Sequence, residues 1–164
     1  MLKPVVLAAA VAAAISAAEA RETVPFADKI EPGTVVVRND ERRLYFVKGD
    51  GTAVRYPVAV GKPGKQWTGE ARIAGKYVRP AWAPPAEIRR DNPRLPRVIP
   101  AGAANNPMGA RALVLDRDEY AIHGTNRPGS IGTPASYGCI RMTNEDVIDL
   151  YSRVRVGTRV VVTQ

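Results

Sequence analysis

The chain has 164 residues, 45% of them hydrophobic, and carries a formal net charge of +8. That length suits one domain with a buried core. One histidine and one cysteine in the whole chain cannot build an ordinary zinc site, so no metal is expected.

The first twenty residues predict a secretory signal peptide. Lys3 provides a short positive region, an apolar run extends from position 5 to about 18, and Ala18, Glu19 and Ala20 form a small-x-small cleavage site. The run is shorter than the roughly 20 residues needed to cross a bilayer, and no later stretch is long enough either. We therefore expect a soluble protein exported to the periplasm or cell envelope. Retention as an uncleaved anchor is the alternative.

The basic charge is compatible with several partners. Loss of residues 1–20 removes Lys3 and Glu19 together and leaves the net charge of +8 unchanged. Nucleic acid is a poor partner for an exported protein, whereas an anionic polymer of the envelope fits export and charge together. The plainer alternative is that most Lys and Arg side chains only solvate the surface.

The sequence of the remaining chain predicts a polar lead-in over 21–32 and one mainly β domain over 33–164. Runs of β-branched and aromatic residues separated by turn formers predict strands at 34–38, 42–47, 53–60, 71–78, 111–115, 120–123 and 158–163. Pro57 favours an edge position or a bulge. The proline-rich stretch 80–100 predicts an extended surface segment without helix or sheet.

One helix is predicted, over 144–154. Asn144 is the expected N-cap, Glu145 and Asp146 lie in the first turn, and the apolar residues that follow recur with helical spacing.

Chemistry is concentrated in the stretch 123–142, which holds the only histidine, His123, and the only cysteine, Cys139. A cysteine nucleophile needs an imidazole near it in space to take and return its proton. Gly138, directly before the thiol, permits a sharp turn that exposes backbone N–H groups to an oxyanion. The opposing interpretation is that both residues are structural and buried. The catalytic interpretation is favoured, because an unpaired thiol in an exported protein needs a functional reason.

Several motifs together resemble the L,D-transpeptidase catalytic domain family of the YkuD or ErfK/YbiS type. They are HGTN from position 123, SIG from 130, S-x-GCIRM from 136, D-x-x-x-LY from 146 and GTRVVV from 157. The likeness extends upstream through PAWAPP from 80 and NPMG from 106, so it covers roughly 33–162. It implies a β-sandwich-like domain, with one short helix after the cysteine motif, and a periplasmic enzyme that remodels peptidoglycan.

The resemblance also implies roles for the central residues. Cys139 is the nucleophile, and His123 is the general base and then the general acid. The N–H groups of Gly138 and Cys139 are expected oxyanion donors, and the carbonyl of Gly124 is expected to orient the imidazole. Ser136 matches the motif serine, either as a local hydrogen-bonding residue or as a catalytic one. We also expect that pairing with His123 lowers the pKa of the thiol from about 8.5.

Three further residues are candidates for substrate binding: Arg141, Asn126 and Tyr137. Arg141 either pairs with a substrate carboxylate or braces the loop. Tyr137 stands where many family members have a second histidine, so we expect it to serve packing or substrate orientation. A second departure is the loose match of the sequence WTGE from Trp67 to the family's Thr-Pro-x-Gly segment.

The implied acyl donor is a peptidoglycan stem tetrapeptide, cut after the L-centre of its third residue with release of D-alanine. The acceptor is an amine of another stem peptide, of an envelope lipoprotein or of a D-amino acid. With water as the acceptor, the activity is that of an L,D-carboxypeptidase or another peptidoglycan amide hydrolase. No cofactor is expected, because the chain has neither a Walker-type loop nor a G-x-G-x-x-G run. A non-catalytic, basic module that binds the cell wall is the alternative from another class.

Overall fold

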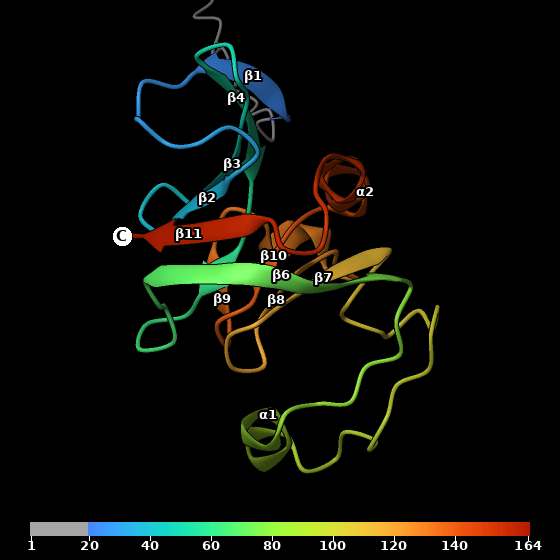
Figure 1. Ribbon diagram of the computed structural model, residues 1–164. Coiled ribbons are helices and arrows are strands. Elements are labelled where there is room, and N and C mark those ends of the chain that lie inside the picture. The colour runs from blue at the N-terminus through green and yellow to red at the C-terminus, as the bar shows by residue number, and fades with distance from the viewer. Residues whose placement is uncertain (1–19) are drawn as a thin grey trace, which may run out of the picture.

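The computed structural model describes residues 20–164, so the predicted signal peptide lies outside the described residues except for Ala20. The chain is mainly β, as the sequence predicts (Figure 1). The strands are β1 Glu22–Pro25, β2 Val35–Arg38, β3 Arg43–Val47, β4 Thr52–Pro57, β5 Val60–Gly61, β6 Gly69–Val78, β7 Arg111–Leu115, β8 Ala121–His123, β9 Pro134–Ser136, β10 Ile140–Arg141 and β11 Arg159–Thr163. The helices are α1 Ala86–Asp91, α2 Asn144–Arg153 and the short 3-10 turn η1 Pro128–Ser130.

Nine of these strands form one bent sheet in the order β1-β4-β3-β2-β11-β6-β7-β8-β10, and β5 pairs with β9 separately. The long strand β6 joins the two parts of the sheet. Its first residues pair with β11, and after a register irregularity at Ile73 and Gly75 it continues along β7. Figure 1 shows β6 crossing between these two neighbours. Because the ladder shifts within β6, the two parts turn toward each other around a common core.

The main core lies between these parts. It joins Val35, Leu44 and Tyr56 from one part to Leu113 and Ile122 from the other, and all five are fully buried. A second apolar cluster lies on the outer face of β2 and β3, where Phe26 covers Val36 and Tyr45. The segment 21–32 therefore contributes strand β1 and a buried aromatic ring, which its polar sequence did not lead us to expect.

Helix α2 packs against β7 and β8 through its buried residues Val147 and Leu150. Its N-cap is Thr143, whose Oγ1 accepts from the Asp146 N–H at 3.1 Å. The prediction of Asn144 as the cap is wrong by one position. The Asn144 carboxamide turns away from the helix, and its Oδ1 accepts from the Ala110 N–H at 2.9 Å.

The proline-rich stretch is the main departure from the predicted fold. It contains helix α1, where the sequence predicted no helix, and an antiparallel bridge between Trp82 and Ile99. The prolines bracket this helix without interrupting it: Pro85 is its N-cap and Pro93 follows its end. We call residues 79–110 the flap. Its base is closed by the Arg79 N–H donating to the Ala110 carbonyl at 3.0 Å.

Pro57 ends β4, because it lacks the N–H that would continue the ladder, and the predicted strand 53–60 is divided into β4 and β5.

Among residues 20–164, no helix is long and apolar enough to cross a bilayer.

Candidate active site

Two short parallel strands bring the only imidazole and the only thiol together. In the β8–β10 pair, Ile140 lies opposite Ile122 and Arg141 lies opposite His123. Cys139 directly precedes β10 and is therefore beside Ala121, while His123 is the last residue of β8. β10 is the last strand at this edge of the sheet, so the site is built where the ladder ends.

His123 is only 4% exposed, and its Nδ1 lies 2.6 Å from the carbonyl oxygen of Gly124. A carbonyl can only accept, so Nδ1 carries the proton in the neutral ring, and Nε2 is the nitrogen that can accept one. Burial lowers the pKa of the imidazole to about 4, although the carbonyl contact opposes this. At neutral pH His123 is therefore a neutral base with a fixed tautomer.

Cys139 is a free, partly buried thiol. Burial raises its pKa above the ordinary value, while the Ala121 backbone amide and the charge of Arg141 act in the opposite direction. Within residues 20–164, no hydrogen bond joins the thiol to the imidazole. The expectation of a pKa lowered by His123 is therefore wrong for this state of the site. Desolvation is the larger effect, and the thiolate must form during reaction.

Ser136 organises the turn that precedes the thiol. Its buried hydroxyl donates to the Cys139 carbonyl at 2.6 Å and accepts from the Gly138 N–H at 3.1 Å. The Gly138 N–H is thus already engaged, whereas the Cys139 N–H has no acceptor in the described part of the chain. Of the two predicted oxyanion donors, the amide of Cys139 is the one available in this conformation.

Gly138 is required by its surroundings. Its φ is +123°, and a Cβ at this position would overlap the ring of Tyr120. Tyr120 stacks on Trp67 with 5.4 Å between ring centroids, and the Trp67 indole N–H donates to the Gly138 carbonyl at 3.0 Å. The sequence predicted no role for either ring. Neither is near the cysteine in sequence, so only the fold shows that they hold the turn.

Arg141 supplies an uncompensated positive charge beside the thiol. Burial lowers its pKa, and its Nε is the only fully buried side-chain nitrogen or oxygen without a hydrogen bond among residues 20–164. It forms no ion pair with a carboxylate of the described chain. A buried donor without an acceptor is costly, which favours a bound anion as its partner over a bracing role.

The other two substrate-binding candidates contact the flap. The Asn126 side chain donates to the Ala104 carbonyl at 3.4 Å, and the Tyr137 hydroxyl donates to Asp91 at 2.6 Å. The described residues hold no group of three or more His, Cys, Asp or Glu side chains that could bind a metal. A surface cleft of about 510 Å³, bordered by Glu31, Arg72 and Arg155, contains none of the catalytic candidates.

Known proteins resemble this chain in sequence. Residues 32–162 match the family model described as "YkuD: L,D-transpeptidase catalytic domain". The chain is 40% identical over 141 residues to "Probable L,D-transpeptidase YbiS" of Escherichia coli K12, and 38% identical over 141 residues to "Probable L,D-transpeptidase ErfK/SrfK" of Salmonella typhimurium. Each alignment covers 81% of this chain but only 45% and 44% of the relatives, so the chain spans less than half their length.

Two solved structures illustrate the fold. An L,D-transpeptidase from Mycobacterium smegmatis superposes with a TM-score of 0.64 at 18% identity, over 80% of this chain and 58% of the other. A chain of similar length from Brucella melitensis, named "Probable carnitine operon oxidoreductase caia", is 42% identical with a TM-score of 0.59, over 91% of this chain and 96% of the other. From the family match over most of its length and the relatives it resembles, the chain belongs to the YkuD family of L,D-transpeptidase catalytic domains.

Proposed function

We propose that this protein is a peptidoglycan L,D-transpeptidase that uses Cys139 as its nucleophile and His123 as its acid and base. The observation that carries the proposal is the parallel β8–β10 pairing, which places the only thiol beside the strand that ends in the only imidazole. The neutral, tautomerically fixed His123 and the unpaired Arg141 support it.

The first half of the reaction forms an acyl-enzyme. Nε2 of His123 takes the thiol proton, and the sulfur of Cys139 attacks the carbonyl carbon at the L-centre of the third residue of a stem tetrapeptide. The Cys139 N–H donates to the developing oxyanion. The C–N bond then breaks, His123 returns the proton to the leaving nitrogen, and D-alanine departs from a thioester. Arg141 binds a carboxylate of the donor.

The second half transfers the acyl group. An acceptor amine gives a proton to His123 and attacks the thioester, so that a new amide forms and the sulfur leaves and recovers the proton. Stem peptides, an envelope lipoprotein and D-amino acids all offer such an amine. With water in place of the amine, the same steps give an L,D-carboxypeptidase. The expected signal peptide and the basic charge suit a site of action in the periplasm or cell envelope.

The Brucella structure carries an oxidoreductase name. This chain has no G-x-G-x-x-G run that would bind a dinucleotide, and its site combines a thiol, an imidazole and a guanidinium suited to acyl transfer.

The test is incubation of the purified protein with disaccharide-tetrapeptide, followed by mass analysis of the products. We expect loss of D-alanine with formation of a cross-linked dimer, or of a tripeptide if water is the acceptor. Cys139→Ala and His123→Ala should each abolish turnover without loss of the fold. Turnover by folded Cys139→Ala, or no reaction of wild type with any amine or water, would contradict the proposal.

A second reagent tests the same nucleophile. Structures similar in fold include "LD transpeptidase LdtMt1 in complex with imipenem" and an Ldtfm "avibactam carbamoyl enzyme". We expect a carbapenem to acylate Cys139 here, because its strained carbonyl is an acyl donor of the same kind. Intact-protein mass spectrometry should show one adduct in wild type and none in Cys139→Ala.

A further inference from the structure

The flap touches both halves of the site. Near its base, the Ala104 carbonyl accepts from Asn126, and the Pro107 carbonyl faces the His123 ring and favours its protonated form. At its far end, the Asp91 carboxylate accepts a hydrogen bond from the Tyr137 hydroxyl at 2.6 Å. The flap therefore contacts both the segment that carries the imidazole and the segment that carries the thiol.

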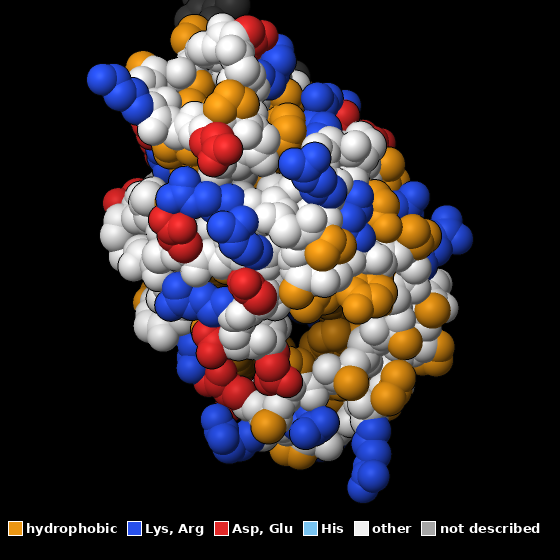
Figure 2. Space-filling view, in the orientation of Figure 1, with side chains coloured by type: hydrophobic (Ala, Val, Ile, Leu, Met, Phe, Trp, Pro, Cys, Tyr) orange, Lys and Arg blue, Asp and Glu red, His pale blue; other side chains and the backbone are white. Residues whose placement is uncertain are grey.

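The two ends of the flap are held differently. At the base, the buried Asn106 side chain donates to the carbonyls of Pro80 and Pro100 at 2.9 and 3.0 Å, which ties the two arms together. At the tip, α1 buries none of its residues. Figure 1 shows α1 standing apart from the sheets, and Figure 2 shows a hollow between α1 and the β6–β7 part of the sheet, with hydrophobic side chains around it.

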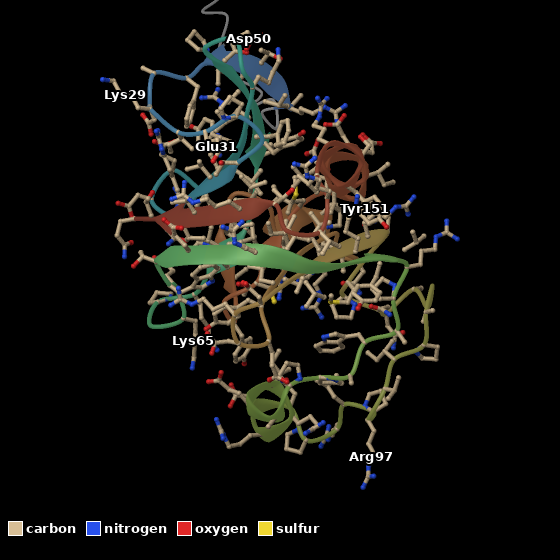
Figure 3. All side chains as sticks on the ribbon, viewed as in Figure 1. Lys29, Glu31, Asp50, Lys65, Arg97 and Tyr151 are labelled. Carbon is tan, nitrogen blue, oxygen red and sulfur yellow. The ribbon has the colours of Figure 1, made fainter. Side chains whose placement is uncertain are left out.

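Polar side chains hold the tip. Lys65 forms an ion pair with Glu87 of α1, and Figure 3 shows Lys65 on the loop above that helix. The second contact joins three groups, which we call the latch: Tyr137, Asp91 and Lys62. The Lys62 ammonium lies 3.6 Å from the Tyr137 ring centroid and 4.0 Å from the Asp91 carboxylate.

The two latch residues outside the flap, Lys62 and Tyr137, lie next to the turn that carries Cys139. Lys62 follows β5 and Tyr137 follows β9, and the Lys62 N–H donates to the Ser136 carbonyl at 2.9 Å. Ser136 in turn holds the Cys139 carbonyl. The position of the flap tip is thus mechanically connected to the turn that presents the thiol.

These contacts are exposed or only partly buried, and ion pairs of this kind are individually weak and screened by salt. A tip held only by them can open and close reversibly, while the buried base stays in place.

We propose that Tyr137 and Asp91 are positioning residues, which hold the flap closed over Cys139 so that substrate reaches the thiol when their contact opens. This inference rests on the proposed acyl transfer for its purpose. It gives Tyr137 a role that does not require contact with substrate. It also adds Asp91, which lies in the proline-rich stretch that the sequence predicted to be extended.

The test measures how fast iodoacetamide alkylates Cys139 in the folded protein at neutral pH, at low and high salt. We expect Asp91→Ala and Tyr137→Phe each to accelerate alkylation by about threefold to tenfold, as loss of a weak exposed contact would allow. The double variant should be no faster than the faster single one. High salt should accelerate wild type more than the double variant, in which the Lys65–Glu87 ion pair is the remaining contact of the latch region that salt can screen. Asp28→Ala, which removes an exposed aspartate paired with Arg38 away from the flap, is the matched control and should match wild type.

Unchanged alkylation in both single variants, effects that multiply in the double variant, or no salt dependence in wild type would overturn the inference. Tyr137→Phe removes one hydroxyl, so it reports on the latch even if Asp91→Ala disturbs α1. Alkylation needs no peptide substrate. If it follows this pattern while disaccharide-tetrapeptide is not turned over, the latch stands and the proposed function fails. The reverse pattern identifies failure of the latch alone.

Discussion

The turn that carries Cys139 and the flap that lies against it are held by opposite kinds of contact. The turn is fixed by the buried Ser136 side chain, the buried Trp67 indole and the partly buried Tyr120 ring against Gly138. The tip of the flap is fixed by exposed charges and one phenol. Both segments are irregular and near each other in space, yet only the first belongs to the core.

The two kinds of contact suit two different requirements: a fixed geometry at the thiol and entry of substrate to it. Acyl transfer needs the thiol and the oxyanion donor held in one geometry, and buried hydrogen bonds that are costly to break provide that. Substrate entry needs a cover that opens at little cost, and exposed ion pairs provide that. Substitutions in the turn should therefore have large effects and those at the flap tip small ones.

The largest effect is expected at Gly138. Gly138→Ala places a Cβ against the Tyr120 ring at a φ of +123°, so the turn must shift and the Cys139 N–H moves with it. We expect kcat/KM to fall by about 100-fold or more, as for loss of one oxyanion donor. Gly129→Ala, where a Cβ would meet nothing within 4 Å, is the control. A Gly138→Ala enzyme within tenfold of wild type would show that the turn is not held rigidly.

The next effect concerns pH and stability. Burial depresses the pKa of folded His123 to about 4, below the unfolded value of 6.5, so the unfolded chain binds more protons between these values. The free energy of unfolding should thus decrease as pH falls from about 6.5 to about 4, by up to roughly 3 kcal/mol from this group. Denaturant titrations should show a shallower decrease in His123→Asn. Parallel curves for the two proteins would mean that the imidazole is not desolvated.

A smaller effect is expected at Trp67. Trp67→Phe keeps a ring on Tyr120 but removes the donor to the buried Gly138 carbonyl, a loss of about 1 to 3 kcal/mol. Part of this should appear as a reduction of kcat by about tenfold, with KM nearly unchanged, because the turn and not the binding surface is affected. Trp82→Phe, in the flap, should not change kcat. An effect of Trp67→Phe confined to KM would place the indole in substrate binding.

The smallest effect is expected at the flap tip. Glu87→Gln removes the ion pair with Lys65 and should leave the midpoint of a denaturant titration nearly unchanged, because a solvent-exposed ion pair contributes little to stability. Tyr56→Phe, which removes a buried hydroxyl that donates to Asp149 at 2.5 Å, should cost about 1 kcal/mol in the same titration. Equal costs would mean that the flap tip is part of the cooperative core.

Local sequence determined most of the strands and the helix after the cysteine motif, because alternating β-branched residues and helical spacing of apolar residues are local signals. It missed α1, because six residues between prolines are too few to show a helical period. It placed the N-cap at Asn144, since Thr143 and Asn144 are both good caps. The tertiary structure decides between them: Asn144 Oδ1 accepts from the Ala110 N–H, and Thr143 caps the helix.

The sequence by itself also determined which residues could perform the chemistry, since one thiol and one imidazole leave no other choice. Tertiary structure decided how they are prepared. Burial makes the thiol harder to ionise and keeps the imidazole neutral. The loop before β6, the β7–β8 turn and the flap bring Trp67, Tyr120 and Asp91, respectively, to the cysteine turn from distant parts of the chain. Desolvation and contacts between distant segments depend on the packed fold, and no local pattern of residues encodes them.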